Sequence, residues 1–358
     1  MAANEILNSE GSTAASGGAG AFRAVAGGLV RLLKAIFLAL LIGWGTLAIY
    51  YSNLPSWARP IVALFFAIGS IAALTLIKSR PRRLLTFWAT FGLVLLWWEL
   101  IPPRNDRDWQ PDLGVLPWAE IDGNRVTFHN IRLCNYRGER DFDVAHYDRT
   151  FDLDTLRAAD LFIVTWGSPH IAHTMMSFAF ANDQYVCFSI ETRKEKGEDY
   201  SIIKGFFRQY ELMYVAADER DLVRLRTNFR NEQVSVYRLR AEPATVRAVF
   251  LGYLESMNSL RERPEWYNAL TSNCLTNIRG HTLPYAVNKH WDWRFLLNGH
   301  LDELIYERGS IDTSLPLAEL KARSLINAKA KSVPNDSQFS KNIRDNLPGM
   351  VDQSAAQK

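Results

Sequence analysis

Cys274, one of only three cysteines in the 358 residues, stands in the polar stretch WYNALTSNCLTN and not among apolar neighbours. The residues TSN before it predict a helix that begins within 271–273, with Ser272 or Asn273 as its cap. A thiol in the first turn of a helix faces unpaired backbone N–H groups and the positive end of the helix dipole, which lower its pKa and favour the thiolate. The same N–H groups would bind the oxyanion of an acyl intermediate. The position of Cys274 therefore predicts a nucleophile.

A general base is predicted about a hundred residues earlier. The stretch HTMMSFAFANDQYVCFSIETR, residues 173–193, indicates two strands joined by a turn at AND. The even-numbered residues of both strands are bulky and apolar, so a hairpin that packs on a core places the odd-numbered residues together on the other face. A three-residue turn then sets His173 opposite Glu191, and a slip of two residues sets it opposite Ser189 or Arg193. An imidazole that faces a carboxylate is an oriented general base.

Together, Cys274 as nucleophile, His173 as base and Glu191 as the group that orients the imidazole form a Cys–His–acid arrangement suited to acyl transfer. His170 and His281 are alternative bases, because one lies three residues before His173 and the other soon after Cys274. A sulfur more than ~6 Å from both imidazole nitrogens would favour a domain that only binds, since a working pair lies ~2.6–3.2 Å apart.

These residues also have structural interpretations. A lone cysteine is often a small core residue, and Glu191 could pair with Arg193 or Lys194 at the surface. Cys134 and Cys187 stand in strand-like runs and are expected to be packing residues. The cluster ADERDLVRLRTNFR that ends at Arg230 is expected to be a solvated helix or strand face, with attraction of anionic lipid headgroups as the alternative.

Charge and motifs exclude several classes of function. Residues 1–104 carry nine Lys or Arg against three Glu, a net +6, whereas the remainder has a net −3. The basic excess belongs to the first third, and nothing in the rest calls for nucleic acid. The cysteines are too dispersed for a disulfide framework or a zinc site, and neither GxGxxG nor GxxxxGKS occurs. We therefore expect no cofactor and no metal.

Three apolar runs, about 29–50, 60–77 and 84–101, predict three transmembrane helices, because each approaches the ~20 residues that cross a bilayer. Basic residues precede the first run, and KSRPRR (78–83) joins the second to the third. The positive-inside rule then places the N-terminus and this loop in the cytoplasm. Three crossings of the inner (cytoplasmic) membrane carry everything after Pro103 to the periplasmic side.

The rest of the chain predicts one α+β domain over 104–325, between a flexible cytoplasmic tail (1–28) and a mobile C-terminal tail (326–358). Apolar residues at a helical period predict a helix from Pro243 to Asn258. Shorter patterns predict strands over 125–133 and 160–166 and a short helix over 153–160.

The segments GSPHIAHTMMSF, FSIETRKEKGEDYS, VAADERDLVRLRTN and WYNALTSNCLTNI resemble the Lnb-type N-terminal periplasmic domain family, over roughly residues 115–285. The anchor is similar to that of one membrane-bound branch. The family is similar to permuted papain-like (NlpC-like) enzymes and to lecithin retinol acyltransferases, in which a strand His precedes a Cys at a helix N-terminus. The resemblance implies that fold, with an antiparallel sheet and helices, Cys274 as the thiol and His173 as the base. Its named member is implicated in bacterial lipoprotein N-acylation.

The expected function is that of a membrane-anchored periplasmic cysteine-dependent acyltransferase or hydrolase that acts on lipid or lipoprotein acyl groups through Cys274 and His173. One alternative is a peptidoglycan-type amidase or peptidase with the same two residues, and another is a non-catalytic envelope binding protein. The expected partners are a phospholipid or lipoprotein substrate and the bilayer, and the oligomeric state is left open.

Overall fold

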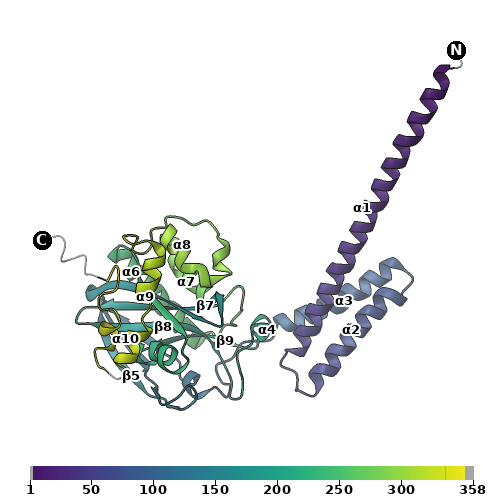
Figure 1. Cartoon of the computed structure of the whole chain (residues 1–358). Helices are drawn as coiled ribbons and strands as arrows, with labels where there is room; N and C mark the ends of the chain where they lie inside the picture. Colours follow the sequence, from purple (N-terminus) through teal and green to yellow (C-terminus); the bar gives the residue numbers. More distant parts are fainter. Residues whose placement is uncertain (1–2, 335, 351–358) are drawn as a thin grey trace. The chain divides into compact units, whose positions relative to one another are not determined.

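The computed structural model describes residues 3–334 and 336–350 and divides the chain into two compact units, Met1–Pro102 and Pro103–Lys358. Helices alone form the first unit (Figure 1). They are α1 (Ala3–Tyr50), α2 (Ala58–Leu76) and α3 (Arg80–Glu99). The second unit combines a large sheet with helices, so the predicted α+β class is confirmed for the globular part.

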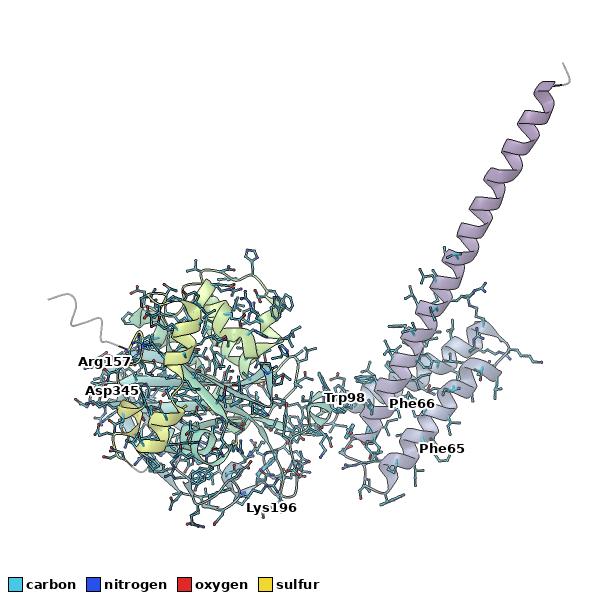
Figure 2. All side chains as sticks on the ribbon, in the orientation of Figure 1. Phe65, Phe66, Trp98, Arg157, Lys196 and Asp345 are labelled. Atoms are coloured by element: carbon cyan, nitrogen blue, oxygen red, sulfur yellow. The ribbon has the colours of Figure 1, made fainter. Side chains whose placement is uncertain are left out.

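The three N-terminal helices pack closely on one another. Gly45 of α1 permits this approach, because a Cβ at this position would lie 2.7 Å from the ring of Phe66 on α2. Trp44 meets Trp98 of α3 edge to face, with ring centroids 5.2 Å apart. Phe65, which precedes Phe66 on α2, is 74 % exposed (Figure 2). The bundle therefore keeps an apolar exterior, which suits a lipid environment.

Two of these helices, Val25–Tyr50 within α1 and Ala58–Leu76, are long and apolar enough to cross a membrane, judged by length and composition. The sequence predicted three. The helix α3 does not qualify, because its first turn carries three arginines and its last residue is Glu99. The sequence predicted a flexible tail over residues 1–28, but in the structure α1 is helical from Ala3 onward. Frequent alanines favour this extension of the helix.

The globular unit is built on an eight-stranded sheet with the order β1–β2–β9–β8–β7–β6–β10, and β5 pairs with β2. All pairings are antiparallel except the one between β2 and β9. The strands of the sheet are β1 (Trp118–Asp122), β2 (Arg125–Arg132), β5 (His146–Asp152), β6 (Leu156–Trp166), β7 (Ser168–Phe180), β8 (Gln184–Arg193), β9 (Glu211–Ala217) and β10 (Gln233–Arg238). A separate small hairpin pairs β3 (Asn135–Tyr136) with β4 (Phe142–Asp143).

Strands β7 and β8 form the predicted hairpin. Their ladder runs from Phe180↔Gln184 to Met175↔Ser189, which is the register that a three-residue turn gives. Residues Asn182 and Asp183 close the turn with φ of 57° and 54°, a left-handed conformation that Asn and Asp tolerate. Because the ladder ends at Met175, the next odd-numbered residue on β7, His173, lies just beyond the last pair.

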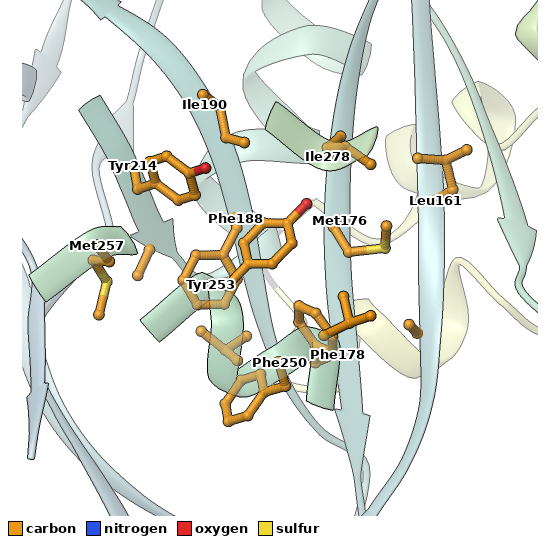
Figure 3. Packing of buried hydrophobic residues seen from close by; sticks show 14 of the residues in the cluster. Leu161, Met176, Phe178, Phe188, Ile190, Tyr214, Phe250, Tyr253, Met257 and Ile278 are labelled. Carbon is orange, nitrogen blue, oxygen red and sulfur yellow. The ribbon is translucent and has the colours of Figure 1, made fainter. Parts of the chain in front are cut away.

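Helices cover both faces of the sheet. The even-numbered hairpin residues pack under α6 (Pro243–Glu262), where Phe178 meets Phe250 edge to face at 4.9 Å and Phe188 meets Tyr253 at 5.2 Å (Figure 3). The predicted helix that starts at Pro243 is thereby confirmed. Also on this face are α7 (Cys274–Thr282), α8 (Leu301–Glu307) and α9 (Leu317–Ser324). The opposite face carries α5 (Glu219–Arg224), α10 (Asn327–Ser332) and α11 (Phe339–Asn342).

Short segments connect these layers. The helix α4 (Ile202–Phe206) lies between β8 and β9, and a π-helical turn, η3 (Leu225–Phe229), follows α5. The 3-10 turns are η1 (Pro111–Leu113), η2 (Leu153–Thr155), η4 (Leu283–Tyr285), η5 (Trp293–Phe295) and η6 (Asn298–His300). The helix predicted over 153–160 was wrong: only η2 is helical, and 156–160 begins β6, because pairing with β7 on one side and β10 on the other overrides local helix propensity.

The segment that follows residue 325 was expected to be a mobile tail, but its described residues pack against the sheet. Phe339, Ile343 and Leu347 recur every four residues and are buried in the second core. Between them, the buried Arg344 guanidinium donates to Asp160 at 2.7 Å and to both carboxylate oxygens of Glu219 at 2.6 and 2.7 Å. The apolar stripe and the paired charge order the segment; residues 351–358 lie outside the described residues.

Candidate functional site

The helix α7 begins at Cys274, one residue after the predicted range 271–273, and its cap is one of the two predicted residues. Asn273 is its cap: the Asn273 side-chain oxygen accepts the Thr276 N–H at 3.0 Å, and the Thr276 hydroxyl accepts the Asn273 N–H at 2.8 Å. This reciprocal capping box fixes the first turn. The N–H groups at the start of the turn have no partner within the helix and point toward its N-terminal end. The thiol is therefore held at the positive end of the helix dipole.

His173 is held from the side of β8. Its Nε2 lies 2.7 Å from the Ser189 hydroxyl oxygen and 3.3 Å from Glu191 Oε1. Ser189 in turn donates to Glu191 Oε1 at 2.5 Å. These contacts arise because His173, Ser189 and Glu191 are odd-numbered residues of the same hairpin and share a face. Since Nε2 is engaged by Ser189 and Glu191, Nδ1 is the ring nitrogen left for the thiol.

The structure brings His173 and Cys274 together at the point where the β7–β8 ladder ends. Helix α7 contacts both strands there, and the thiol and the imidazole lie near enough for the charge of each to shift the pKa of the other. Burial opposes the charged imidazole, but Glu191 and the Cys274 thiolate outweigh burial and raise the pKa of His173 to about 9. Burial likewise opposes the thiolate, but the nearby His173 and Thr174 lower the pKa of Cys274. The pair therefore favours thiolate and imidazolium.

Thr174 follows His173 on β7, so its side chain points to the opposite face of that strand, where it is buried. Among the described residues its Oγ1 has no hydrogen-bond partner at standard geometry, although the residue is fully buried. The hydroxyl lies close enough to the Cys274 sulfur to help lower the pKa of the thiol. A rotatable donor without another acceptor is suited to a sulfur that gains negative charge.

Arg226 completes the arrangement, and the sequence did not indicate this role. Its Nη2 lies 2.9 Å from Glu191 Oε1, and its side chain is buried, in the π-helical turn η3. The cluster ADERDLVRLRTNFR, expected to be a solvated face, instead buries several of its charges, among them Asp221 in a bidentate pair with Arg132. Only the three-dimensional pairing distinguishes Arg226 from the exposed arginines of the chain.

The alternative histidines have other partners. His170 Nδ1 lies 2.9 Å from His300 Nε2. His281 Nε2 lies 2.8 Å from the Tyr214 hydroxyl, and burial lowers the pKa of His281 to about 4, so this ring stays neutral. Neither is the imidazole that contacts Cys274.

The other two cysteines are packing residues, as predicted. Cys134 and Cys187 are fully buried and unpaired. Burial raises the pKa of Cys134 to about 12, with Asp221 adding to the effect, and burial raises the pKa of Cys187 well above the ordinary thiol value. Cys274 is the one cysteine of the three whose surroundings favour the thiolate.

A thiol at a capped helix start, a strand histidine and a carboxylate define a candidate thiol site on a mixed α+β domain. Residues 143–299 match the family described as Lnb N-terminal periplasmic domain. The match contains both β7 and the start of α7, and it therefore supports the resemblance seen in the sequence. Comparisons with curated proteins and with solved structures found no match. The family match and the apolar N-terminal helices fit a membrane-anchored periplasmic protein of the cell envelope.

Proposed function

We propose that the chain is a periplasmic cysteine-dependent acyltransferase or hydrolase, anchored in the inner membrane, that acts on lipid or lipoprotein acyl groups. The observation that carries the proposal is the position of His173, between Glu191 on one side and the Cys274 thiol at the start of α7 on the other. Such a sequence of nucleophile, base and orienting acid is what thiol-based acyl transfer requires. The antiparallel hairpin beside the helix is in keeping with a permuted papain-like, NlpC-like fold.

In the first half of the proposed reaction, the Cys274 thiolate attacks the carbonyl carbon of an ester. A C–S bond forms, and the carbonyl oxygen takes negative charge that the N–H groups at the start of α7 stabilise. The C–O bond then breaks, and the imidazolium of His173 gives its proton to the departing alkoxide. The product is a thioester on Cys274 and a free alcohol.

The second half regenerates the thiolate. An amine or a water molecule attacks the thioester carbonyl, and neutral His173 accepts the proton that the nucleophile loses. The C–S bond breaks, and the acyl group leaves as an amide or as a carboxylic acid. An amine acceptor makes the enzyme a transferase, and water makes it a hydrolase, with the same two residues in the same roles.

The surroundings of the thiol favour a lipid substrate over a peptide. Burial raises the pKa of the Tyr200 and Tyr267 phenols, and the Cys274 thiolate lies near enough to add to this effect. Next to them, Ile202, Ile203 and Leu270 are about half exposed. Apolar side chains at the rim of a thiol site suit an acyl chain, whereas a peptide with several charges would call for charged partners.

The membrane topology forms part of the proposal. If basic residues hold the N-terminus and the 78–83 loop in the cytoplasm, a periplasmic domain needs an odd number of crossings. We therefore infer that α3 is the third span, with its arginine-rich first turn at the cytoplasmic interface. Alkaline phosphatase fused after residue 358 should then be active in whole cells, and a fluorescent protein that folds only in the cytoplasm should stay dark. The opposite pair of results would reject this topology.

The test of the chemistry is intact-mass analysis of the full chain in detergent with a diacyl phospholipid. We expect one acyl adduct, lost on treatment with hydroxylamine as a thioester is. Cys274→Ser should abolish the hydroxylamine-sensitive adduct and leave the melting temperature unchanged, while Cys187→Ser keeps the adduct if the variant folds. Full acyl transfer by Cys274→Ser would reject the proposal.

A further inference from the structure

A group of exposed apolar side chains lies beside the candidate thiol site. We define the α4 rim as these residues: Tyr200, Ile202, Ile203, Phe206 and Leu270. Their exposed fractions run from 39 % for Phe206 to 52 % for Ile203 and Leu270. Although Leu270 is distant in sequence, the Ala269 N–H donates to the Gly205 carbonyl at 3.1 Å, so its loop is fastened to α4. The α4 rim is therefore one continuous surface.

The loop and α4 approach each other closely. A Cβ at Gly205 would lie 3.3 Å from the Ala269 Cβ and 3.4 Å from the Tyr267 ring, so only glycine fits without displacement of these neighbours. Tyr267 is buried beneath the rim, and its phenol lies near enough to that of the half-exposed Tyr200 to influence its pKa. Both phenols are close enough to Cys274 to interact with its charge. The same loop contacts the start of α7, because Asn273 Nδ2 donates to the Ala269 carbonyl at 2.8 Å, so the rim lies beside the thiol.

The α4 rim also lies beside the place where the chain enters the globular unit. The Arg104 N–H donates to Glu211 Oε1 at 3.1 Å, and Arg107 Nη1 donates to Glu211 Oε2 at 2.8 Å. Glu211 is buried and begins β9, a few residues after α4, and it pairs with Trp266 at the start of the 266–271 loop. The entry point is therefore fixed to the same corner of the fold as the rim.

This entry point has a short reach to α3. Helix α3 ends at Glu99, and five residue steps lead to Arg104. An extended chain covers at most ~3.6 Å per residue, so the five steps span at most about 18 Å. If α3 spans the membrane, as proposed above, the linker therefore cannot hold Arg104 farther than this from the end of α3. The α4 rim is an exposed apolar group that is fastened to this corner, through the bridge between Glu211 and Trp266.

From these observations we propose that the α4 rim inserts its apolar side chains into the outer leaflet of the membrane that holds the anchor, so that an acyl chain passes from the leaflet to Cys274 without crossing water. Isoleucine, leucine and phenylalanine side chains at the tip of a short helix gain free energy on entering the acyl region, and the tyrosine suits the headgroup level. Lys204, within α4, would face lipid phosphates. The docking rests on the proposed membrane location, and it names the source from which the proposed reaction takes its acyl group.

The test places a nitroxide label on the rim of the full chain. Ile203→Cys is made together with Cys274→Ser, since the two remaining cysteines are fully buried, and the protein is reconstituted in vesicles of phosphatidylethanolamine and phosphatidylglycerol. We expect the label to collide with oxygen more than with a water-soluble nickel chelate, as labels among acyl chains do. Equal access of the chelate to the labels at 203 and at the control position would overturn the proposal.

The matched control is Ile121→Cys in the same background. Ile121 is 50 % exposed, close to the 52 % of Ile203. It belongs to the β1–β2 hairpin, whose Asn124 contacts Arg247 near the start of α6, whereas Asn105 of the entry segment contacts the carbonyl of Leu260 near the end of that helix. The β1–β2 hairpin therefore lies toward the end of α6 that is opposite to the entry segment. A label at 121 should collide with the water-soluble nickel chelate more than a label at 203 does.

A second measurement separates docking from chemistry. Ile203→Asp should lower acyl transfer from vesicle phospholipid about tenfold, roughly the effect of losing one buried aliphatic side chain, and should lower transfer from the same phospholipid in detergent micelles by a clearly smaller factor. Ile121→Asp should change neither rate. If Ile203→Asp and the parent transferred acyl groups from vesicles at equal rates, the docking proposal would be rejected and the proposed chemistry would be unaffected. The labelled chain lacks the nucleophile, so the accessibility of the label tests docking independently of catalysis. Absence of an acyl adduct on the wild-type chain would reject the proposed function and would not bear on docking.

Discussion

Glu191 Oε1 lies 3.3 Å from Nε2 of His173, and the two side chains come from neighbouring strands just beyond the last pair of the β7–β8 ladder. Glu191 thus faces the ring nitrogen opposite to the one left for the thiol. A carboxylate in that position stabilises the protonated imidazole and fixes its orientation, which is the task of the acid in triads of this kind.

This relationship predicts the pH dependence of turnover. His173 must be protonated to release the leaving group, and its pKa is raised to about 9. The protonated fraction is complete at neutral pH and is lost as the pH rises through about 9, so the basic limb of kcat/KM should lie there. Glu191→Gln removes the carboxylate that raises this pKa, and the limb should move to lower pH. The kcat/KM of a short-chain ester, whose alkoxide needs the proton of His173, is measured against pH; a limb that stays near 9 would show that Glu191 does not set the charge of His173.

Arg226 should have the opposite effect on the same limb. Its guanidinium lowers the pKa of His173 and also neutralises Glu191. Arg226→Met removes both influences, so the basic limb should move to higher pH, while Arg226→Lys keeps the charge and should leave the limb nearly in place. The Met variant should also lose about 3 kcal/mol of stability, because a buried pair loses one partner. A shift in the same direction as that of Glu191→Gln would contradict this assignment.

The cap of α7 permits stability and thiol acidity to be separated. Asn273→Ala removes the acceptor of the Thr276 N–H and should cost about 1 kcal/mol, seen as a lower urea midpoint. Asn273→Asp retains that acceptor but replaces the amide that donates to the Ala269 carbonyl at 2.8 Å, so stability should also fall by about 1 kcal/mol. Its negative charge next to Cys274 disfavours the thiolate, and alkylation of Cys274 by iodoacetamide at neutral pH should slow. Fast alkylation in the Asp variant would argue against electrostatic control of this thiol.

The ordered C-terminal segment makes a prediction for stability. Arg344→Met leaves Asp160 and Glu219 buried without this partner, and loss of one member of a buried ion pair costs about 3–5 kcal/mol. Arg323→Met is the matched control, because Arg323 and Glu319 form a half-exposed pair on α9 that should contribute at most about 0.5 kcal/mol. Thermal unfolding of the two variants should therefore differ clearly, and similar melting temperatures would show that the network does not hold the segment.

Local signals in the sequence were sufficient for part of the site. The start of α7 followed from cap chemistry around Asn273, and the hairpin register followed from the alternation of apolar residues and a three-residue turn. Both depend on residues a few positions apart. These patterns placed His173 on the same face as Glu191, and the resemblance to a known family linked His173 to Cys274.

The features that the sequence did not indicate depend on contacts between residues far apart in the chain. Arg226 is separated from Glu191 by 35 residues, and Arg344 from Asp160 by 184. Neither arginine differs in its local context from an exposed one, so no periodicity distinguishes it. The misassigned stretch 156–160 has the same origin, because β6 is flanked by two strands whose pairing outweighs the local propensity of its residues.

The position of the C-terminal segment also has a consequence for biosynthesis. Phe339, Ile343 and Leu347 cover part of one face of the sheet, and Arg344 pairs with the charges of Asp160 and Glu219, although these residues follow the last strand by about a hundred positions. The sheet therefore cannot complete this face until the ribosome has synthesised and released this later segment. A domain that crosses a membrane during its synthesis would stay open, and so able to thread through a translocation channel, until this segment follows and completes the fold.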